Sequence, residues 1–312
     1  METRRIGTLE VSVVGLGCNN FGMAIDADAT RAVVDAAIEA GINYFDTAES
    51  YGNGQSEEYL GRALAGRRDQ VLVATKWGFV AKPDAGERQG RPEHVRASLD
   101  ASLQRLGMDH VDHYQLHRPD PDTPIAETLG VLDELRTAGK IREIGCTGFS
   151  AAQLAEAAEA GAQAGIASFP SVQNHYSLLT RTPETDGVLE LCASAGIAFV
   201  PYFPLESGLL TGKYKPGAGV PDDSRFARWG EKRSAAFIDE DKVATVARLE
   251  AWAAERGHSV LELAMGYLAS NPTVATVIAG CTKPSQVRSN VTAVGWAMTD
   301  AERAEVRALL DR

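Results

Sequence analysis

The sequence predicts a single α/β domain of the (β/α)8 TIM barrel class. Short runs rich in valine and isoleucine alternate with segments rich in alanine, leucine and glutamate along nearly all 312 residues. The short runs are apolar on both faces, which is typical of buried parallel strands, and their alternation with helical segments indicates βα units. Barrels of this class often reach such a length as one domain, so we expect residues 1–312 to form one barrel domain.

The expected strands are short and are separated by segments of helical composition. An opening piece, Arg4–Val11 with Gly7 in its middle, precedes them and is predicted to form a small β-hairpin. The eight barrel strands are expected at Val13–Leu16, Tyr44–Asp46, Val71–Lys76, His110–Leu116, Ile141–Cys146, Phe169–Asn174, Ile197–Tyr202 and Thr276–Ala279.

The helical segments carry the terminal signals of real helices. A glycine stands just past a helix and before a strand at positions 41, 107, 139 and 196, where it can form a left-handed C-cap. Ser150 is an expected N-cap. The helices are predicted at Ala29–Ala40, Ser56–Leu64, Pro92–Leu106, Ile125–Ala138, Ala151–Ala164, Gly187–Ala195, Asp241–Glu255 and Val260–Ser270, with a C-terminal helix at Asp300–Leu310 and a short one after Gly280.

An open, doubly wound sheet is the structural alternative to a barrel. Its dinucleotide-binding form needs a Gly-x-Gly-x-x-Gly turn after the first strand. Here the corresponding segment, residues 15–20, reads Gly-Leu-Gly-Cys-Asn-Asn and lacks the third glycine. The barrel is therefore favoured.

Composition excludes several classes of function. Hydrophobic residues make up 44 % and charged residues 23 %, as in a globular protein, and the net charge of −11 argues against a nucleic-acid-binding protein. No apolar stretch exceeds the length of a strand, and no signal-type segment follows the N-terminus, so we expect a cytoplasmic protein without a membrane span. The four cysteines form no CxxC pair, which favours free thiols over a zinc site.

Four reactive side chains are expected at one end of the barrel. Asp46 and Lys76 end strands, and Tyr51 and His117 follow strands. Barrel enzymes place their chemistry at the C-terminal ends of the strands. Jointly, these four residues point to chemistry more than to a structural ion pair and packed rings.

These residue types suit the reduction of a carbonyl group. Negative charge develops on the carbonyl oxygen, so hydrogen-bond donors must be aimed at it. A tyrosine can donate the proton, and a lysine ammonium beside it is expected to lower its pKa of about 10. A buried lysine needs a carboxylate partner to stay charged, and a histidine can orient the oxygen.

Several segments together resemble the aldo-keto reductase superfamily. They are Gly41–Gly52 (GINYFDTAESYG), Ser56–Gly61 (SEEYLG), Thr75–Gly78 (TKWG), Gln115–Asp120 (QLHRPD), Val172–Asn174 (VQN), Pro204–Tyr214 (PLESGLLTGKY) and Ile278–Gly280 (IAG) with Gln286 and Asn290. The resemblance covers almost the whole chain, and the segments occur in order at the ends of expected strands.

The resemblance implies an NADPH-dependent reductase of aldehydes or ketones, with NADH the less expected cofactor. Tyr51 would then be the general acid, Lys76 would adjust its pKa, Asp46 would pair with Lys76, and His117 would orient the carbonyl. Trp77 is an expected substrate contact. The implied cofactor-binding residues are Cys18, Asn19, Thr147, Gln173, Tyr202, Pro204, Leu205, Gly208, Lys213, Gly280, Thr282, Lys283, Gln286 and Asn290.

Within that set, each residue has an implied part of the cofactor. Gln173 would hold the nicotinamide carboxamide, and Tyr202 would stack on the ring. The Leu205–Lys213 loop would cover the pyrophosphate. Gly280–Asn290 would hold the adenosine end, with Lys283 at a 2′-phosphate. The chain departs from many relatives at Thr147-Gly148, where they carry Ser-Asn, and at Ser289, where they carry Glu.

Two alternatives to carbonyl reduction would use the same residues. A Schiff-base enzyme of aldolase type would use Lys76 as a nucleophile, but Asp46 should keep that lysine charged. A redox-sensing subunit that binds NADPH and turns over slowly would contain the same four residues, Asp46, Tyr51, Lys76 and His117. His113 and His117 share one parity on their strand, yet no further ligand joins them, so we expect no metal.

The substrate is expected to be a small carbonyl compound, and the protein a monomer or weak homo-oligomer. The loops that would select the substrate are Trp77–Arg91, Arg118–Pro124 and Phe203–Phe237, together with the C-terminal segment. Their aromatic residues, Trp77, Phe79, Phe203, Phe226 and Trp229, suit an apolar pocket, whereas Arg225, Arg228 and Arg233 could meet an acidic substrate or the cofactor phosphates.

Overall fold

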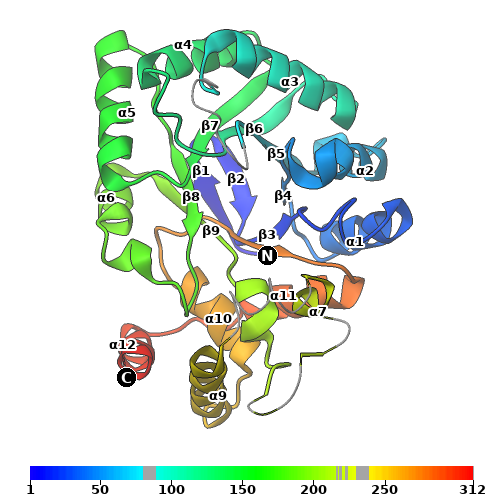
Figure 1. The fold of residues 1–312 in the computed structure, drawn as a ribbon, viewed down its shortest axis with the longest axis vertical. Coiled ribbons are helices and arrows are strands. Elements are labelled where there is room, and N and C mark those ends of the chain that lie inside the picture. Colours follow the sequence, from blue (N-terminus) through cyan, green and yellow to red (C-terminus); the bar gives the residue numbers. More distant parts are fainter. Residues whose placement is uncertain (80–88, 216, 218–219, 222–223, 230–238, 312) are drawn as a thin grey trace.

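The computed structural model describes residues 1–79, 89–215, 217, 220–221, 224–229 and 239–311, and this part of the chain forms the expected barrel (Figure 1). One parallel sheet holds eight strands in the order β10-β3-β4-β5-β6-β7-β8-β9. The strands are β3 (Val14–Gly17), β4 (Tyr44–Asp46), β5 (Leu72–Trp77), β6 (Val111–Leu116), β7 (Ile141–Thr147), β8 (Ser171–His175), β9 (Ala198–Tyr202) and β10 (Val277–Gly280).

The sheet is nearly closed between its first and last members. Phe199 of β9 forms a parallel bridge with Val274, which lies just before β10. Phe199 N donates to Thr273 O and Ala275 N donates to Phe199 O, both at 2.9 Å. These bonds satisfy the edge of β9 that would otherwise stay unpaired.

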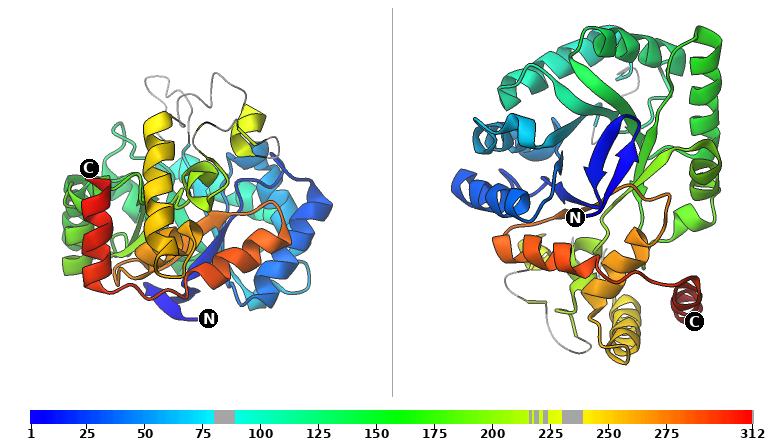
Figure 2. Two further views of the ribbon diagram at one scale, coloured as in Figure 1. Left: turned by 90° about the horizontal axis from the view of Figure 1, so that it is seen from below. Right: turned by 180° about the vertical axis from the view of Figure 1, so that it is seen from behind.

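The N-terminal hairpin closes one end of this barrel. Strands β1 (Thr3–Ile6) and β2 (Leu9–Ser12) pair antiparallel, and Gly7 at the turn has φ +55°. Ile6 and Leu9 are fully buried against side chains that point into the barrel. Figure 2 (left) shows the hairpin and α7 (Arg225–Trp229) at opposite ends of the molecule, so the end that carries the C-termini of the strands stays free of the hairpin. We call this free end the mouth.

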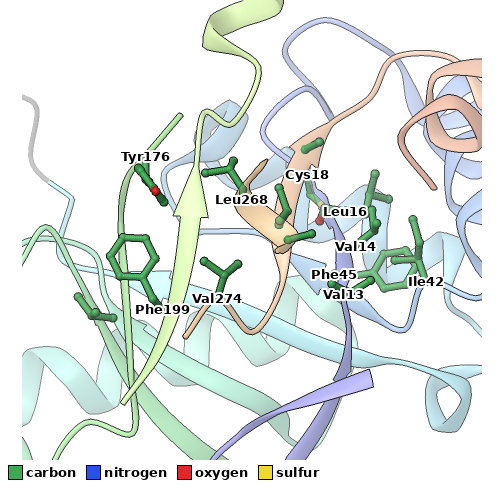
Figure 3. Close-up of a cluster of buried hydrophobic side chains, with 14 of the residues drawn as sticks. Val13, Val14, Leu16, Cys18, Ile42, Phe45, Tyr176, Phe199, Leu268 and Val274 are labelled. Atoms are coloured by element: carbon green, nitrogen blue, oxygen red, sulfur yellow. Dashed lines mark hydrogen bonds between the residues drawn. The ribbon is translucent and has the colours of Figure 1, made fainter. Parts of the chain in front are cut away.

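Helices follow the strands and form the outer layer. The longer ones are α1 (Ala27–Glu39), α2 (Gln55–Ala63), α3 (Pro92–Leu106), α4 (Ile125–Thr137), α5 (Ala151–Ala164), α6 (Val188–Ala195), α9 (Glu240–Ala254), α10 (Val260–Ala269), α11 (Pro284–Ala293) and α12 (Asp300–Leu310). No helix in the described ranges is long and apolar enough to span a membrane. Apolar side chains from both layers pack between the strands and the helices, and Figure 3 shows part of this core around Leu16, Phe45 and Phe199.

The predicted elements are confirmed, with differences at their ends. Helix α1 begins two residues earlier than expected because Asp26 caps it, accepting from Ala29 N at 2.9 Å. Ser150 caps α5 as predicted and forms a capping box with Gln153. The segment Phe203–Phe237 was expected to be irregular, yet it contains the 3₁₀ helix η4 (Glu206–Thr211) and helix α7. Such short helices are too brief to show helical periodicity.

Helices α2 and α3 touch at a glycine. A Cβ on Gly61 would lie 2.1 Å from the backbone oxygen of Leu106. Backbone cannot yield as a flexible side chain does, so this contact requires glycine.

Gly61→Ala should therefore destabilise the protein by about 2–3 kcal/mol through overpacking. Gly130→Ala is the matched control, because Gly130 lies within α4 with no atom within 4 Å of an added Cβ. That control should be neutral or stabilise by up to about 1 kcal/mol, since alanine favours helix. Urea unfolding of both variants measures the difference, and equal stabilities would contradict the packing argument.

Candidate active site

A buried ion pair lies at the centre of the mouth. Lys76 Nζ donates to Asp46 Oδ2 at 2.6 Å and to the backbone oxygen of Thr47 at 2.9 Å. The side chains of Lys76 and Asp46 are 0 % and 2 % exposed. Asp46 ends β4, and Lys76 is the next-to-last residue of the neighbouring strand β5. In the parallel register Asp46 pairs with Ala74, and Lys76 has the same side-chain parity as Ala74. The structure thus brings together the two charges that the sequence predicted.

Two amides complete the partners of the Asp46 carboxylate. Gln115 Nε2 and Gln173 Nε2 donate to Asp46 Oδ1 at 3.1 and 3.2 Å. Each oxygen of the buried carboxylate therefore has a donor, which offsets the cost of removing it from water. Gln115 was not singled out from the sequence. Its parity on β6, which it shares with His113, was the available signal that it points into the barrel.

Tyr51 lies beside this pair. It begins the 3₁₀ helix η1 (Tyr51–Gly54), which follows β4, and its ring centroid is 5.2 Å from Lys76 Nζ. Burial raises the pKa of Tyr51 above its ordinary value, and the charge of Lys76 only partly opposes this rise. Lys76 thus lowers the pKa of Tyr51 as expected, but burial is the larger effect and the net shift is upward. The phenol is protonated near neutral pH.

Lys76 stays charged in spite of its burial. Burial alone would lower the pKa of Lys76, but Asp46 and Tyr51 raise it, and the net shift is upward. A charged ammonium has no lone pair for attack on a carbonyl. This protonation state opposes a Schiff-base role for Lys76.

His117 also lies beside Tyr51. The two rings meet edge to face with centroids 5.7 Å apart. Burial, followed by the charges of Lys76 and Arg118, holds the pKa of His117 well below its usual range. The ring is therefore neutral, and its Nδ1 is buried without a hydrogen-bond partner among the described residues. A buried polar atom without a partner carries a free-energy cost and is typical of a functional site.

The loop that carries Tyr51 is held by residues on both sides. Ser56 Oγ donates to Cys18 O at 2.8 Å, and Gly78 N donates to Glu49 Oε1 at 2.8 Å. Glu57 is fully buried and accepts from Thr75 Oγ1 and Arg105 Nε, each at 2.6 Å. The Ser-Glu pair that contributed to the resemblance is therefore structural: it fixes the loop and helix α2 rather than touching the mouth.

Three residues expected at a nicotinamide lie at the mouth. Gln173 is 2 % exposed, and Thr147 Oγ1 is buried with no hydrogen-bond partner in the described part of the chain. Tyr202 is partly exposed and stacks on His175 with centroids 5.3 Å apart. The unpaired hydroxyl and the open aromatic face fit a planar ring with an amide substituent.

The loop after β9 takes a strained path that one carboxylate anchors. Phe203, Glu206 and Ser207 all have positive φ, between 45° and 56°. Glu206 Oε1 accepts from His175 Nε2 at 2.8 Å, from Ser177 Oγ at 2.5 Å and from Thr180 Oγ1 at 2.8 Å. These bonds hold the loop to the segment after β8 and offset its strain. No local pattern indicated this role of Glu206, because its partners His175, Ser177 and Thr180 are distant in the chain.

A glycine forms a cradle where β10 ends. A Cβ on Gly280 would lie 2.7 Å from Asn19 Oδ1 and 3.5 Å from Arg225 Nη2. Arg225 Nη2 donates to Asn20 Oδ1 at 3.0 Å, which places a guanidinium at this cradle from helix α7. From the sequence, Arg225 could meet either an acidic substrate or the cofactor phosphates. In the structure it lies beside Gly280. The cradle and its positive charge fit a phosphate.

The remaining residues expected at the adenosine end gather around the start of α11. Gln286 Oε1 accepts from Thr282 N at 2.7 Å, and Asn290 Nδ2 donates to Cys281 Sγ at 3.3 Å. Lys283 precedes the helix and is exposed. Residue Arg233 lies outside the described part of the chain, as do the side chains of Arg228 and Trp229.

Two expected contacts do not reach the mouth. Trp77 is fully buried, stacks on Tyr114 with centroids 4.3 Å apart, and donates through Nε1 to Gln89 O. Because side chains alternate along a strand, Trp77 points to the helices when Lys76 points into the barrel. The prediction that Trp77 contacts substrate is wrong for this structure. The Cys18 side chain is likewise buried in the layer beneath the helices.

Phe79 is the aromatic side chain that the structure places at the mouth instead. It is 36 % exposed, and its ring centroid lies 4.9 Å from that of His117. Within the described residues, no cluster of three or more His, Cys, Asp or Glu side chains could hold a metal ion. The structure thus brings together at the mouth the tyrosine, the neutral histidine and the buried ion pair.

Comparison with known proteins agrees with this geometry. Residues 13–311 match the profile of the "Aldo/keto reductase family". The chain is 35 % identical to a "Probable voltage-gated potassium channel subunit beta" from Arabidopsis thaliana, covering 94 % of this chain and 91 % of that one. It is 33 % identical to an "NADH-specific methylglyoxal reductase" from Escherichia coli, covering 100 % and 99 %.

A solved structure has the same fold. Aldo-keto reductase AKR11C1 from Bacillus halodurans, in its holo form, is 30 % identical and superimposes with a TM-score of 0.79, covering 99 % of this chain and 96 % of that one. The family match spans nearly the whole chain, and the reductase relatives act on carbonyl compounds. The chain belongs to the aldo/keto reductase family and is an oxidoreductase that acts on carbonyl groups.

Proposed function

We propose that the protein reduces an aldehyde or ketone to an alcohol with NADPH, using Tyr51 as the proton donor. The observation that carries this proposal is the protonated phenol of Tyr51, whose ring lies beside both the Lys76 ammonium and the neutral ring of His117. A carbonyl oxygen placed among these three groups would meet donors and one positive charge. Such preorganised donors stabilise the charge that develops on the oxygen.

Each of the four predicted catalytic residues at the mouth has a distinct task in this scheme. His117 orients the carbonyl oxygen without adding a charge. Tyr51 transfers its phenolic proton to that oxygen as the carbon becomes tetrahedral. The Lys76 ammonium stabilises the tyrosinate that remains, and Asp46 keeps Lys76 charged and in place. Solvent then returns a proton to Tyr51.

The residues at the mouth also support a nicotinamide cofactor. When bound in reduced form, it would supply the hydride that adds to the carbonyl carbon. Thr147 and Gln173 would hold its carboxamide, Tyr202 would lie against its ring, and the Leu205–Lys213 loop would lie over its pyrophosphate. Gly280 and Arg225 would receive the phosphate end.

Replacement of the acid tests the proposal directly. Tyr51→Phe should lower kcat/KM for 4-nitrobenzaldehyde about 100-fold or more, because general acid catalysis of this kind contributes that much. Tyr59→Phe is the matched control: it removes a phenolic hydroxyl from a partly exposed residue of α2. The oxidation of NADPH measured at 340 nm reports both rates, and an active Tyr51→Phe variant would refute the role.

The protonation states predict the pH profile of reduction. Burial raises the pKa of Tyr51 above about 10, and the pKa of His117 is held well below about 6.5. As pH rises, the acid form of Tyr51 is lost only when pH passes its raised pKa. We therefore expect kcat/KM to stay level from about pH 7 to 9 and to fall above about 10. A steep inflection near pH 6.5 would show that His117 titrates instead.

NADPH is proposed over NADH because basic residues stand at the adenosine end. Lys283 is exposed beside the Gly280 cradle, although the relative from Escherichia coli is named as NADH-specific. Lys283→Ala should raise KM for NADPH about tenfold and change KM for NADH little, since only NADPH carries the 2′-phosphate. Lys140→Ala, at the start of β7, removes a charge from the opposite end of the barrel as a control. Equal effects of Lys283→Ala on both cofactors would contradict the assignment.

A second candidate function is a cofactor-binding subunit with slow turnover. The specific observation in its favour is the likeness to a plant protein named as a potassium channel subunit beta. Asp46, Tyr51, Lys76 and His117 would be present in both cases. The rates of hydride transfer and of cofactor release must therefore distinguish the two functions. Single-turnover hydride transfer that is far faster than the release of oxidised cofactor would favour the sensing role. Comparable rates would favour an ordinary reductase.

A further inference from the structure

One exposed arginine stands directly beside the mouth. Arg118 follows His117 in sequence, and its guanidinium Cζ lies 4.3 Å from the ring centroid of Phe79. The Phe79 ring in turn lies 4.9 Å from the ring of His117, which lies 5.7 Å from that of Tyr51. A positive charge therefore sits one aromatic ring away from the groups that hold the carbonyl.

Two residues of the mouth respond to the charge of Arg118. It helps to hold the pKa of His117 low, after burial and Lys76, and it opposes the rise that burial causes in the pKa of Tyr202. Both effects place the guanidinium within electrostatic range of the proton-donating side and of the ring expected to lie against nicotinamide. The charge belongs to the same mouth.

Arg118 has no acidic partner among the described residues, in contrast to Arg68 and Arg105. Arg68 and Arg105 end in short contacts with Asp112 and Glu57, at 2.5 and 2.6 Å. Arg118 makes no hydrogen bond or salt bridge to any residue that the structure describes, and its ring contact with Phe79 fixes its position instead. The chain carries a net charge of −11, so an exposed and uncompensated guanidinium here is a local reversal of sign.

The nearby carboxylates are already occupied. Asp46 is bound by Lys76, Gln115 and Gln173, and Glu206 accepts three hydrogen bonds from the segment after β8. A guanidinium fixed by an aromatic face offers its N–H groups as a fork that matches an oxyanion. An anionic group on a substrate would meet no competing acid of the described mouth.

We infer that the mouth selects carbonyl substrates that carry an anionic group, a carboxylate or a phosphate, and that Arg118 is the residue that recognises it. This inference rests on the proposed function, because the carbonyl must lie at Tyr51 and His117. Phe79 positions the guanidinium and forms an apolar wall between it and the reacting carbon. A short apolar or aromatic spacer between carbonyl and anion fits that order of groups.

The test compares matched pairs of aldehydes. 4-Carboxybenzaldehyde is paired with its methyl ester, and 4-formylphenyl phosphate with 4-methoxybenzaldehyde, so that each pair differs in charge. The wild-type protein should reduce the charged member of at least one pair with the higher kcat/KM, and the pair concerned separates carboxylate from phosphate. Arg118→Gln should lower the charged-to-uncharged ratio about tenfold or more, chiefly through KM. Raising the ionic strength should lower the wild-type ratio by screening.

Arg31→Gln is the matched control, since it removes the same charge from an exposed position on α1, away from the mouth. It should leave the ratio within about twofold of wild type. No preference for either charged aldehyde, or a ratio that is the same in Arg118→Gln, would overturn the inference. If the wild-type protein reduces no member of either pair and does not reduce 4-nitrobenzaldehyde, the proposed function fails. Calorimetric binding of 4-carboxybenzaldehyde and its ester to wild type and Arg118→Gln then still decides the role of Arg118.

Discussion

The contact between Lys76 and Asp46 is the constraint on which the rest of the mouth depends. Both charges are removed from water, and their attraction offsets that cost only because the geometry is close and the remaining valences are filled. Gln115 and Gln173 donate to the second oxygen of the carboxylate, so residues of four strands, β4, β5, β6 and β8, contribute to one hydrogen-bonded group. Loss of one member would leave an uncompensated charge in the barrel, and this explains why polar residues stand at the ends of strands that are otherwise apolar.

Burial around this pair sets the protonation of its neighbours. The same low-polarity surroundings keep Tyr51 as a phenol and His117 as a neutral imidazole, while the paired Lys76 remains an ammonium. One acid, one uncharged donor and one fixed cation therefore coexist within a few ångströms near neutral pH. A charged His117 beside Lys76 would repel it, and a tyrosinate could not donate a proton. The electrostatics thus favour proton donation to an oxygen over nucleophilic attack by the lysine.

The barrel, the hairpin and the four polar residues of the mouth could be predicted from the sequence because each depends on local signals. The four residues are Asp46, Tyr51, Lys76 and His117. Strand and helix patterns, glycine caps and strand-end polar residues are all readable along the chain. Trp77 was predicted to contact substrate because it follows Lys76 at the end of a strand. Side chains alternate along β5, so the indole points to the helices when Lys76 points into the barrel. The lowering of the Tyr51 pKa by Lys76 was predicted, but the larger effect of burial was not, because burial is a property of the folded mouth. Gln115 and Glu206 find their partners across strands and loops, so no local pattern indicated their roles.

The two ends of the barrel differ in a way that explains why only one carries chemistry. At the hairpin end, Thr8 donates through N and Oγ1 to Glu143 Oε1, at 2.7 and 2.6 Å, and apolar side chains of the hairpin fill the remaining space. The Glu143 carboxylate is therefore paired within the protein. At the mouth, by contrast, His117 Nδ1 and Thr147 Oγ1 are buried without partners among the described residues, and Arg118 has no acid. We propose that ligands complete these groups at the mouth: a carbonyl oxygen at His117, a cofactor amide at Thr147 and an anion at Arg118.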